Sequence, residues 1–383
     1  MRGDRPQGRV PQKARPEGYS AQNELKREGV VMAMNDSGTG KETRLPTRRA
    51  FLRGAAAMCA AAALGGAARA ALGAMAPVPD WAVRQTPVLP AGGSGKFSIL
   101  QVTDLHMHYI AKGYLGTPQQ LDKIKAMVEI FKPDMIMNTG DFWANVTEPG
   151  GADTCKWLCA EFAKFGVPWA FAWGNHDESK DYNRTHRILE GAPDSLYRGA
   201  AADGNYRIEV KPPGAAAPVW NLIVLNNSRG GFRQPEIDWF EQEAAVIRSE
   251  TPDPPPAFVF AHIPARQYED IAAPGKAVGV KLESVCHEDG SADAVPAFGR
   301  AGFVKAMFCG HDHVNDYCGQ SHGINLHYGR ALGGYGEDRV RKGATLITAD
   351  IESGTYQARS VFEDGSSVTF DTFTDIQEPG RIY

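Results

Sequence analysis

The sequence lacks several features that would define its class at once. It has six cysteines in 383 residues and no CxxC pair, which excludes a structural zinc ribbon and a thioredoxin-like redox motif. It has no apolar run of the about 20 residues that a membrane-spanning helix needs. Hydrophobic residues make up 43% and charged residues 22% of the chain, a balance that fits neither general disorder nor a polytopic membrane protein.

The body of the chain also lacks positive charge. Residues 1–70 hold 13 Lys and Arg against 6 Asp and Glu, whereas the remaining residues hold 28 against 39. An acidic body is unsuited to tracking nucleic-acid phosphates, so we expect no nucleic-acid binding. An anionic substrate would need local positive charge, and bound metal ions are one way to supply it.

The first seventy residues have the pattern of a leader followed by an export signal. Residues 1–46 are polar and show no apolar periodicity, which is typical of disorder. The pair Arg48-Arg49 then precedes an Ala-rich run over residues 54–68, and this order is typical of a bacterial Tat signal. The alternative is an uncleaved anchor or an ordinary Ala-rich helix.

The Ala-rich run is weakly apolar and is interrupted by Arg69, which fits a signal peptide better than a spanning helix. The small-x-small triplet Ala68-Arg69-Ala70 offers a cleavage site. We therefore expect the Tat machinery as a partner, and a periplasmic or secreted protein without a stable membrane anchor. Residues 71–95, rich in Pro, Ala and Gly, are expected to form a linker.

After the linker the chain alternates strands with helices and then becomes mostly β. Apolar runs and helical spacing predict strands over 96–102, 134–138, 167–173, 206–210, 219–225, 257–261 and 304–309, and helices over 118–131, 153–165, 181–190 and 235–247. This order fits two sheets packed face to face with helices outside. We expect one catalytic domain over residues 96–375, in which the irregular residues 265–300 form a long loop over the site.

Metal-liganding side chains recur directly after the predicted strands. Five sets have this placement: Asp104-x-His106, Gly140-Asp141, Gly174-Asn175-His176-Asp177, Ala261-His262 and Gly310-His311-Asp312-His313. Ligand sites in α/β sheets lie at the carboxyl ends of strands, so the five sets are expected to converge. Carboxylate, imidazole and amide oxygen suit Fe, Mn or Zn, and no soft thiolate set accompanies them.

On these motifs the chain resembles the calcineurin-like metallophosphoesterases, and within them the bacterial and plant proteins called purple-acid-phosphatase-like. The resemblance covers about residues 96–360. It implies an α/β fold, a four-layer α/β/β/α sandwich with a dinuclear metal site at the strand carboxyl ends. True purple acid phosphatases place a Tyr three residues after the bridging Asp, where this chain has Ala144, so we expect no purple charge-transfer band.

The resemblance also assigns roles to the motif residues. It implies seven ligands: for the first metal Asp104, His106 and His313, for the second Asn175, His262 and His311, and as a bridge between the two Asp141. It places His176 beside the leaving-group oxygen as a general acid or charge stabiliser. Asp177 would orient His176.

The reaction follows from what two neighbouring cations do to water and phosphate. Cations about 3.5–4 Å apart clamp the attacking water and a phosphoryl oxygen, and lower the pKa of the water from 15.7 toward about 7. We expect hydrolysis of a small-molecule phosphate ester by a hydroxide bound at this centre, with monoesters favoured. The alternatives are a phosphodiesterase acting on nucleotides or phospholipid headgroups, and a non-catalytic metal-binding scaffold.

Five further residues are candidates outside the motifs. Arg266 and Arg330 would grip a phosphate oxygen, and Asn227, which follows a predicted strand, would reach the edge of the site. Solvated loop positions are the alternative for these residues. Cys286 and Cys318 are the candidate disulfide, because export would place the protein in an oxidising compartment.

Overall fold

The computed structural model describes residues 85–107, 109–110, 113–114, 119–144, 151–334, 336, 339–370 and 376–377. The chain divides into two units, Met1–Ala76 and Pro77–Tyr383, and every described residue belongs to the second. The expected leader and export signal, with most of the linker, therefore lie outside the described residues. Within the described part of the chain, no helix combines the length and the apolarity that a membrane crossing requires.

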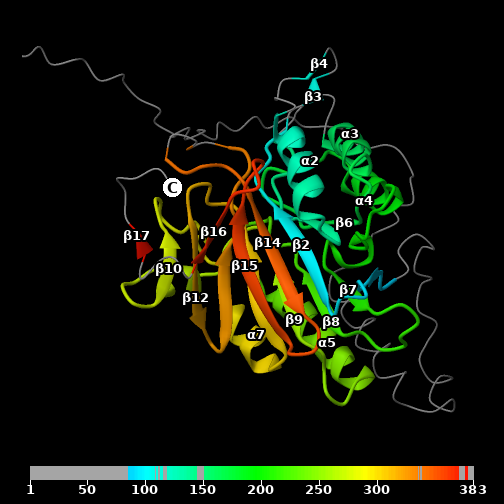
Figure 1. Ribbon diagram of the computed structural model, residues 1–383, viewed down its shortest axis with the longest axis vertical. Coiled ribbons are helices and arrows are strands. Elements are labelled where there is room, and N and C mark those ends of the chain that lie inside the picture. The colour runs from blue at the N-terminus through cyan, green and yellow to red at the C-terminus, as the bar shows by residue number, and fades with distance from the viewer. Residues whose placement is uncertain are drawn as a thin grey trace, which may run out of the picture. The chain divides into compact units, whose positions relative to one another are not determined.

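Two large β-sheets form the centre of the second unit (Figure 1). The six-stranded sheet has the order β16 (Ser367–Thr369), β15 (Thr355–Val361), β14 (Ala344–Asp350), β2 (Lys96–Val102), β5 (Met135–Asn138) and β6 (Trp169–Phe171). The nine-stranded sheet has the order β1 (Val88–Pro90), β7 (Tyr206–Lys211), β8 (Trp220–Val224), β9 (Ala257–Phe260), β11 (Val304–Cys309), β13 (Ile324–Tyr328), β12 (Asp316–Ser321), β10 (Ala277–Val280) and β17 (Ile376–Gln377). A hairpin of β3 (Tyr109–Ile110) and β4 (Gly113–Tyr114) stands apart from both.

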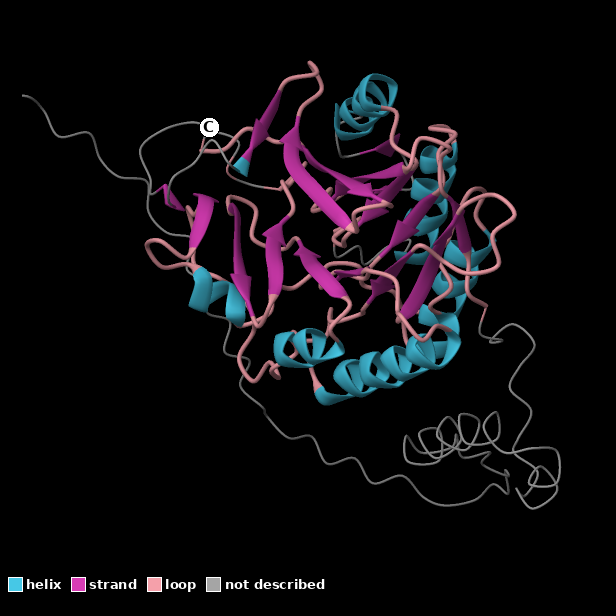
Figure 2. Ribbon diagram, turned by 60° about the horizontal axis from the view of Figure 1, so that its bottom comes forward, coloured by secondary structure: helices cyan, strands magenta, loops and turns pink. Residues whose placement is uncertain are grey.

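Helices cover the outer faces of the two sheets (Figure 2). On the six-stranded side these are α2 (Gln119–Phe131), α3 (Gly151–Ala163) and α4 (Tyr182–Gly191). On the nine-stranded side they are α5 (Gln234–Glu250), α6 (Gln267–Ile271) and α7 (Val295–Ala301). A short 3₁₀ turn, η3 (Ala200–Ala202), precedes β7. The expected four-layer α/β/β/α sandwich is therefore confirmed.

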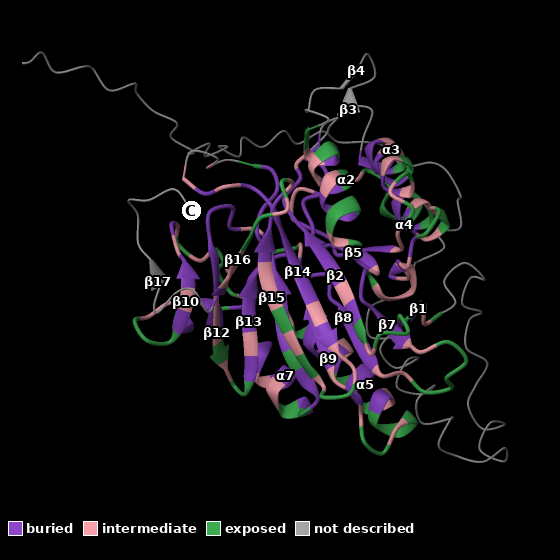
Figure 3. Ribbon diagram, in the orientation of Figure 1, coloured by how far each residue is buried: buried purple, intermediate pink, exposed green. Residues whose placement is uncertain are grey.

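Alternate side chains of β8 pack into two different hydrophobic cores. Leu222 and Val224 belong to the core between the sheets, where the rings of Phe97 and Trp220 lie 5.6 Å apart. Ile223, one residue out of phase, packs into the core beneath α5 and α7. Successive strand residues point to opposite faces, so a strand buried on both sides reads as a continuous apolar run. Figure 3 shows β2, β8 and β9 as mostly buried.

Parallel pairing brings the carboxyl ends of five strands to one edge. β2, β5 and β6 run parallel in one sheet, and β9 and β11 run parallel in the other. The sheets are tied together near this edge, because the Gln101 side chain donates hydrogen bonds to Thr139 Oγ1 (2.9 Å) and to the carbonyl of Cys309 (3.0 Å). The loops that follow these strands therefore face one another.

Two sequence expectations about irregular segments are wrong. Residues 88–90, expected within the linker, form β1 and pair in parallel with β7. Residues 265–300, expected as one long loop, contain α6, β10 and α7. Short elements of four to seven residues show too little periodicity to be recognised from sequence.

Candidate metal centre

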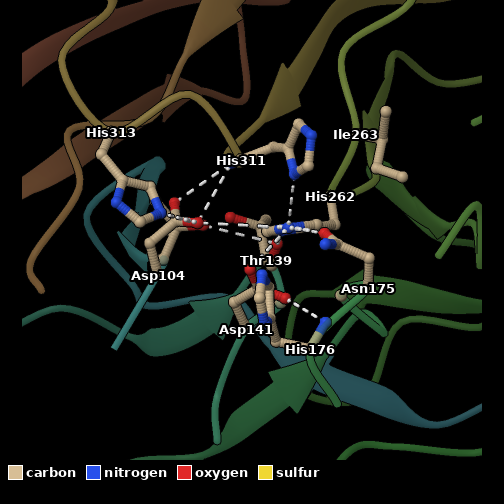
Figure 4. A network of polar contacts seen from close by, with 12 residues as sticks. Asp104, Thr139, Asp141, Asn175, His176, His262, Ile263, His311 and His313 are labelled. Carbon is tan, nitrogen blue, oxygen red and sulfur yellow. Dashed lines mark hydrogen bonds and ion pairs between the residues drawn. The ribbon is translucent and has the colours of Figure 1, made fainter. Parts of the chain in front are cut away.

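The site is built by the loops that leave β2, β5, β6, β9 and β11. Asp104 and His106 follow β2, Asp141 follows β5, and Asn175 follows β6, while His262 follows β9. The loop after β11 supplies the remaining imidazoles, His311 and His313. Figure 4 shows the labelled side chains of this set pointing toward one another, with Asp104 and His313 on one side of Asp141, and His262 and Asn175 on the other.

The first group joins Asp104, His106, Asp141 and His313, whose ligand atoms lie within 4.8 Å of one another. The Nε2 atoms of His106 and His313 are 3.0 Å apart. Nε2 of His313 is 3.4 Å from Oδ1 of Asp104. Imidazole nitrogens and carboxylate oxygens that converge at such distances have the arrangement of a metal-ligand shell.

The second group joins Asp141, His262 and His311. Nε2 of His262 lies 3.0 Å from Oδ1 of Asn175 and 3.3 Å from Nδ1 of His311. The other ring nitrogen of His262, Nδ1, lies 2.8 Å from the carbonyl of Thr139. That contact holds the ring with Nε2 toward the cluster, as backbone carbonyls do for metal-bound histidines. The contribution of Thr139 has no sequence signal of its own.

Asp141 belongs to both groups, and the two groups meet at one of its oxygens. Oδ2 of Asp141 lies 3.5 Å from Nε2 of His106 and 3.2 Å from Nε2 of His262. Its other oxygen, Oδ1, accepts a hydrogen bond of 2.8 Å from the backbone N–H of His176. This is the position that a bridging carboxylate between two cations requires.

The backbone at the centre is held in conformations that most residues avoid. Asp104, His106, Asp141 and His311 all have positive φ, between 48° and 78°. Each such conformation costs of order 1 kcal/mol for a residue other than Gly. Strain of this kind collects at functional sites, where it aims the side chains. Gly174 allows a close approach, because a Cβ atom there would collide with the backbone and carboxylate of Asp141.

The buried carboxylates carry charge that the imidazoles stabilise. Burial raises the pKa of Asp104, but the hydrogen bond with His313 and the charges of His313, His262 and His106 outweigh it, so the pKa of Asp104 lies well below its usual value. Burial likewise raises the pKa of Asp141, and the charge and hydrogen bond of His262 reverse this, so that its pKa is lowered.

In the metal-free protein, the imidazoles differ in their protonation states. Burial lowers the pKa of His106 and of His311 to about 4, so both are neutral and free to act as ligands at neutral pH. Burial also disfavours charge on His262, but the charge and hydrogen bond of Asp141 raise its pKa to about 10. In the metal-free protein His262 is therefore protonated, and its positive charge lies beside Asp141.

His176 lies at the mouth of the cluster. Its ring is partly exposed, and its centroid lies 4.9 Å from the ring of His106. The hydrogen bond from its backbone N–H to Asp141 fixes the loop that carries it. An imidazole in this place can exchange a proton with a group bound over the cluster.

Asp177 contacts the backbone around His176, and its expected role in orienting that residue stays a prediction. Its Oδ1 accepts a hydrogen bond from the backbone N–H of Trp143 (3.0 Å), and its Oδ2 accepts one from that of Gly174 (2.8 Å). Burial, followed by the charge of Asp141, raises the pKa of this carboxyl well above its usual value. Asp177 therefore fastens the Asn175–His176 loop to the loop after β5.

Asn227 and Arg330 are not placed to bind a substrate. Asn227 is fully buried, and its side chain bonds to the backbone of His262 and Ile263. Arg330 is 1% exposed, and its guanidinium pairs with Asp316 at 2.6 Å. Both predictions are wrong, because the side chains are used inside the fold.

Arg266 lies at the surface rather than in the cluster. Its guanidinium pairs at 2.7 Å with Asp293, and both side chains are about half exposed, at 52% and 47%. A pair of this exposure contributes little to stability. The structure thus gives Arg266 a partner other than a substrate phosphate.

The predicted disulfide is also wrong, because Cys286 and Cys318 are both free. Cys286 lies in the loop between β10 and α7, where its backbone N–H donates to Asp312. Cys318 lies within β12 and lines a groove together with His327 and Tyr356. Sequence spacing could not show that the two cysteines lie in different parts of the fold, because both positions depend on long-range packing.

Comparison with known proteins agrees with this geometry. The model of the calcineurin-like phosphoesterase family matches residues 97–315, more than half of the chain. The chain belongs to this family. The match spans the five loops from Asp104 to His313 that build the candidate centre.

Several relatives and solved structures are similar to this family member. "Probable inactive purple acid phosphatase 14" of Arabidopsis thaliana is 26% identical over 311 residues, which cover 68% of this chain and 77% of the relative. Phosphatase DCR2 of Saccharomyces cerevisiae is 27% identical over 265 residues, covering 58% of this chain and 45% of that protein. A dimetal phosphatase from Danio rerio is 15% identical with a TM-score of 0.47, and the match covers 72% of this chain and 99% of that one.

Proposed function

We propose that this family member is a two-metal hydrolase of phosphate esters, with monoesters as the preferred class. The observation that carries the proposal is the shared carboxylate of Asp141, whose Oδ2 lies 3.5 Å from His106 and 3.2 Å from His262. One oxygen between two imidazole groups is what a pair of cations at about 3.5–4 Å would require.

The donor set fits such a pair. Asp104, His106 and His313 would hold one cation, Asn175, His262 and His311 the other, and Asp141 both. Nitrogen and oxygen donors of this kind suit Fe, Mn or Zn. When bound, two cations supply Lewis acidity at a phosphoryl oxygen and lower the pKa of water toward about 7.

The chain's own residues complete the reaction. The Asp104 and Asp141 carboxylates are buried and ionised, so the centre carries the charge that holds the cations. Asn175 contributes an uncharged amide oxygen, which limits repulsion of an anionic substrate. The partly exposed imidazole of His176 stands where it can protonate the leaving oxygen.

A non-catalytic scaffold is the alternative of another class, since the names of three Arabidopsis relatives include "probable inactive". A phosphodiesterase is the alternative within the enzyme class. We would load the protein with Mn²⁺, Fe²⁺ or Zn²⁺, count metal per chain by elemental analysis, and compare p-nitrophenyl phosphate with bis-p-nitrophenyl phosphate, with and without chelator.

Each outcome of that assay distinguishes among a monoesterase, a diesterase and a non-catalytic scaffold. Two metals per chain with chelator-sensitive hydrolysis support the enzyme, and the ratio of the two rates separates monoesterase from diesterase. Two metals without hydrolysis of either ester favour the scaffold. A chain that retains no metal overturns the proposal.

We further propose export through the Tat pathway to the periplasm or the medium. Support comes only from the sequence, in the Arg48-Arg49 pair before the Ala-rich run over residues 54–68. Replacing both with Lys keeps the charge but removes the paired guanidinium groups. We expect this variant to stay in the cytoplasm, as measured by cell fractionation, and normal export would remove the assignment.

A further inference from the structure

A third cluster of ligand atoms adjoins the two-metal centre and involves a thiol. We propose that Cys286, His311 and Asp312 form an additional site for one thiophilic divalent cation, such as Zn²⁺ or Cd²⁺. One ligand atom from each of the three lies within 4.8 Å of the others. Sulfur, imidazole and carboxylate together form a donor set that Zn²⁺ takes, with water completing four-fold coordination.

The three residues come from two segments that are fastened together. Oδ2 of Asp312 accepts hydrogen bonds from the backbone N–H of Cys286 (3.3 Å) and from the hydroxyl of Tyr328 (2.5 Å). Asn315 reinforces this, because its Oδ1 accepts the backbone N–H of Leu282 at 3.0 Å. The thiol is therefore held beside the loop after β11 by its own backbone.

The two ring nitrogens of His311 are directed toward different sites. Its Nδ1 lies 3.3 Å from Nε2 of His262 and belongs to the two-metal cluster. Its Nε2 lies 3.9 Å from Oε1 of Glu288, two residues after Cys286 in the same loop. The two nitrogens lie on different sides of the imidazole ring, so its outer nitrogen faces the segment that carries the thiol.

The proposed ligands also differ in solvent exposure, as expected for a site that a cation enters from solvent. Asp312 is 2% exposed, whereas Cys286 is exposed. Because one side of the cluster reaches solvent, a cation and its water ligand can enter. On binding, the S–H bond of Cys286 and the Nε2–H bond of His311 break, both protons leave to solvent, and the sulfur and the nitrogen form their bonds to the cation. His311 is then an imidazolate shared by the two sites, because a neutral ring offers only one unprotonated nitrogen.

The site stands on its own residues, and only its effect on hydrolysis rests on the proposed function. A cation that takes His311 at Nε2 withdraws electron density from the ligand of the neighbouring cation and lies at the rim of that centre. We therefore expect excess Zn²⁺ or Cd²⁺ to inhibit hydrolysis at least tenfold in the wild type, and not in the Cys286→Ser variant.

Cadmium titration tests the site without an activity assay. Protein already holding its two metals is titrated with Cd²⁺, and thiolate-to-metal charge-transfer absorption is recorded in the ultraviolet together with the Cd²⁺ bound per chain. We expect the wild type to bind one further equivalent with a new band, and Cys286→Ser to lose both. Cys318→Ser is the matched control, because Cys318 is partly exposed and lies outside the cluster, and it should behave as the wild type.

A band that persists in Cys286→Ser, or that disappears in Cys318→Ser, would overturn the proposal, as would no further equivalent in the wild type. If Cys286→Ser does not fold, alkylation of the wild type decides instead. Cd²⁺ should then protect Cys286, but not Cys318, from iodoacetamide in peptide mapping, and equal labelling with and without Cd²⁺ overturns the site. Absence of all hydrolysis with an intact band would count against the proposed function alone.

Discussion

The side-chain oxygen of Asn227 accepts hydrogen bonds from the backbone N–H groups of His262 (3.2 Å) and Ile263 (3.0 Å). Its amide nitrogen donates to the carbonyl of Ile263 at 2.7 Å. One buried side chain thus fixes the segment that presents His262 to the cluster. Asn227 is a positioning residue, which explains why it is fully buried beside a polar site.

We expect Asn227→Ala to lower the free energy of unfolding by about 1–3 kcal/mol, because it leaves buried backbone groups without partners. We also expect weaker metal retention, because the loop of His262 loses its anchor. Chemical denaturation and elemental analysis measure the two effects. Asn325→Ala is the control, since that amide is only half-buried and bonds to Tyr356. An unchanged variant at position 227 would contradict this role.

Asp141→Ala should lose most of the bound metal. The variant removes the one carboxylate common to both groups of ligands, so neither cation keeps a full shell. Metal content, counted per chain after dialysis, should fall from about two to well below one. Asp293→Ala, at an exposed carboxylate paired with Arg266, should keep full content. Retention of both metals in Asp141→Ala would refute the bridge.

His176→Ala should keep its metal and lose turnover. Its imidazole stands at the mouth of the cluster rather than among the grouped ligands, so metal content should stay near that of the wild type. The kcat should fall by roughly 10²–10⁴, the range for general acid–base catalysis. His322→Ala changes an exposed histidine and serves as the control. Wild-type turnover in His176→Ala would remove its proposed role.

Metal uptake should release protons. The pKa of His262 in the metal-free protein is raised to about 10, through the charge and hydrogen bond of Asp141 acting against burial. At neutral pH a cation must displace this proton, so affinity should rise about tenfold per pH unit for each proton released. Calorimetry in buffers of different ionisation enthalpy counts the protons. An affinity independent of pH between 6 and 8 would contradict the assignment of His262 as a ligand.

His186 should destabilise the protein in mild acid. Burial lowers its pKa to about 4, against the opposing charge of Asp203, whereas in the unfolded chain the pKa is about 6.5. Between these values the unfolded state binds more protons, so the free energy of unfolding falls as pH falls from about 6.5 to about 4, by up to about 3 kcal/mol. Nδ1 of His186 lies 2.7 Å from the hydroxyl of Tyr197, and His186→Gln, which can still bond to that hydroxyl, should show a smaller fall. Equal pH slopes in denaturation curves of the two proteins would contradict this expectation.

The sequence was sufficient for the longer strands and helices because their periodicities are local. The strand predicted over residues 96–102 is β2 as observed, and the helix predicted over 118–131 begins one residue later, as α2. The convergence of the ligand loops also followed from sequence. A buried parallel strand is recognisable from its apolar run, and its carboxyl end must lie beside those of its neighbours.

The partners of individual polar side chains were decided only by the tertiary structure. Arg330 and Asn227 carry the same chemical groups whether they face a substrate or the interior. Arg330 is buried against Asp316, which lies in β12. Asn227 is buried against the backbone of His262, which is distant in sequence.

The same reason separates the two cysteines. The sequence predicted a disulfide between Cys286 and Cys318, but packing places Cys286 beside His311 and Cys318 in β12. By itself the sequence determined the longer strands and the loops that carry ligands, because hydrophobic periodicity and strand ends are local properties, but it missed the short strands β1 and β10. Only the tertiary structure decided which polar groups meet, because contacts across two sheets depend on how the sheets pack.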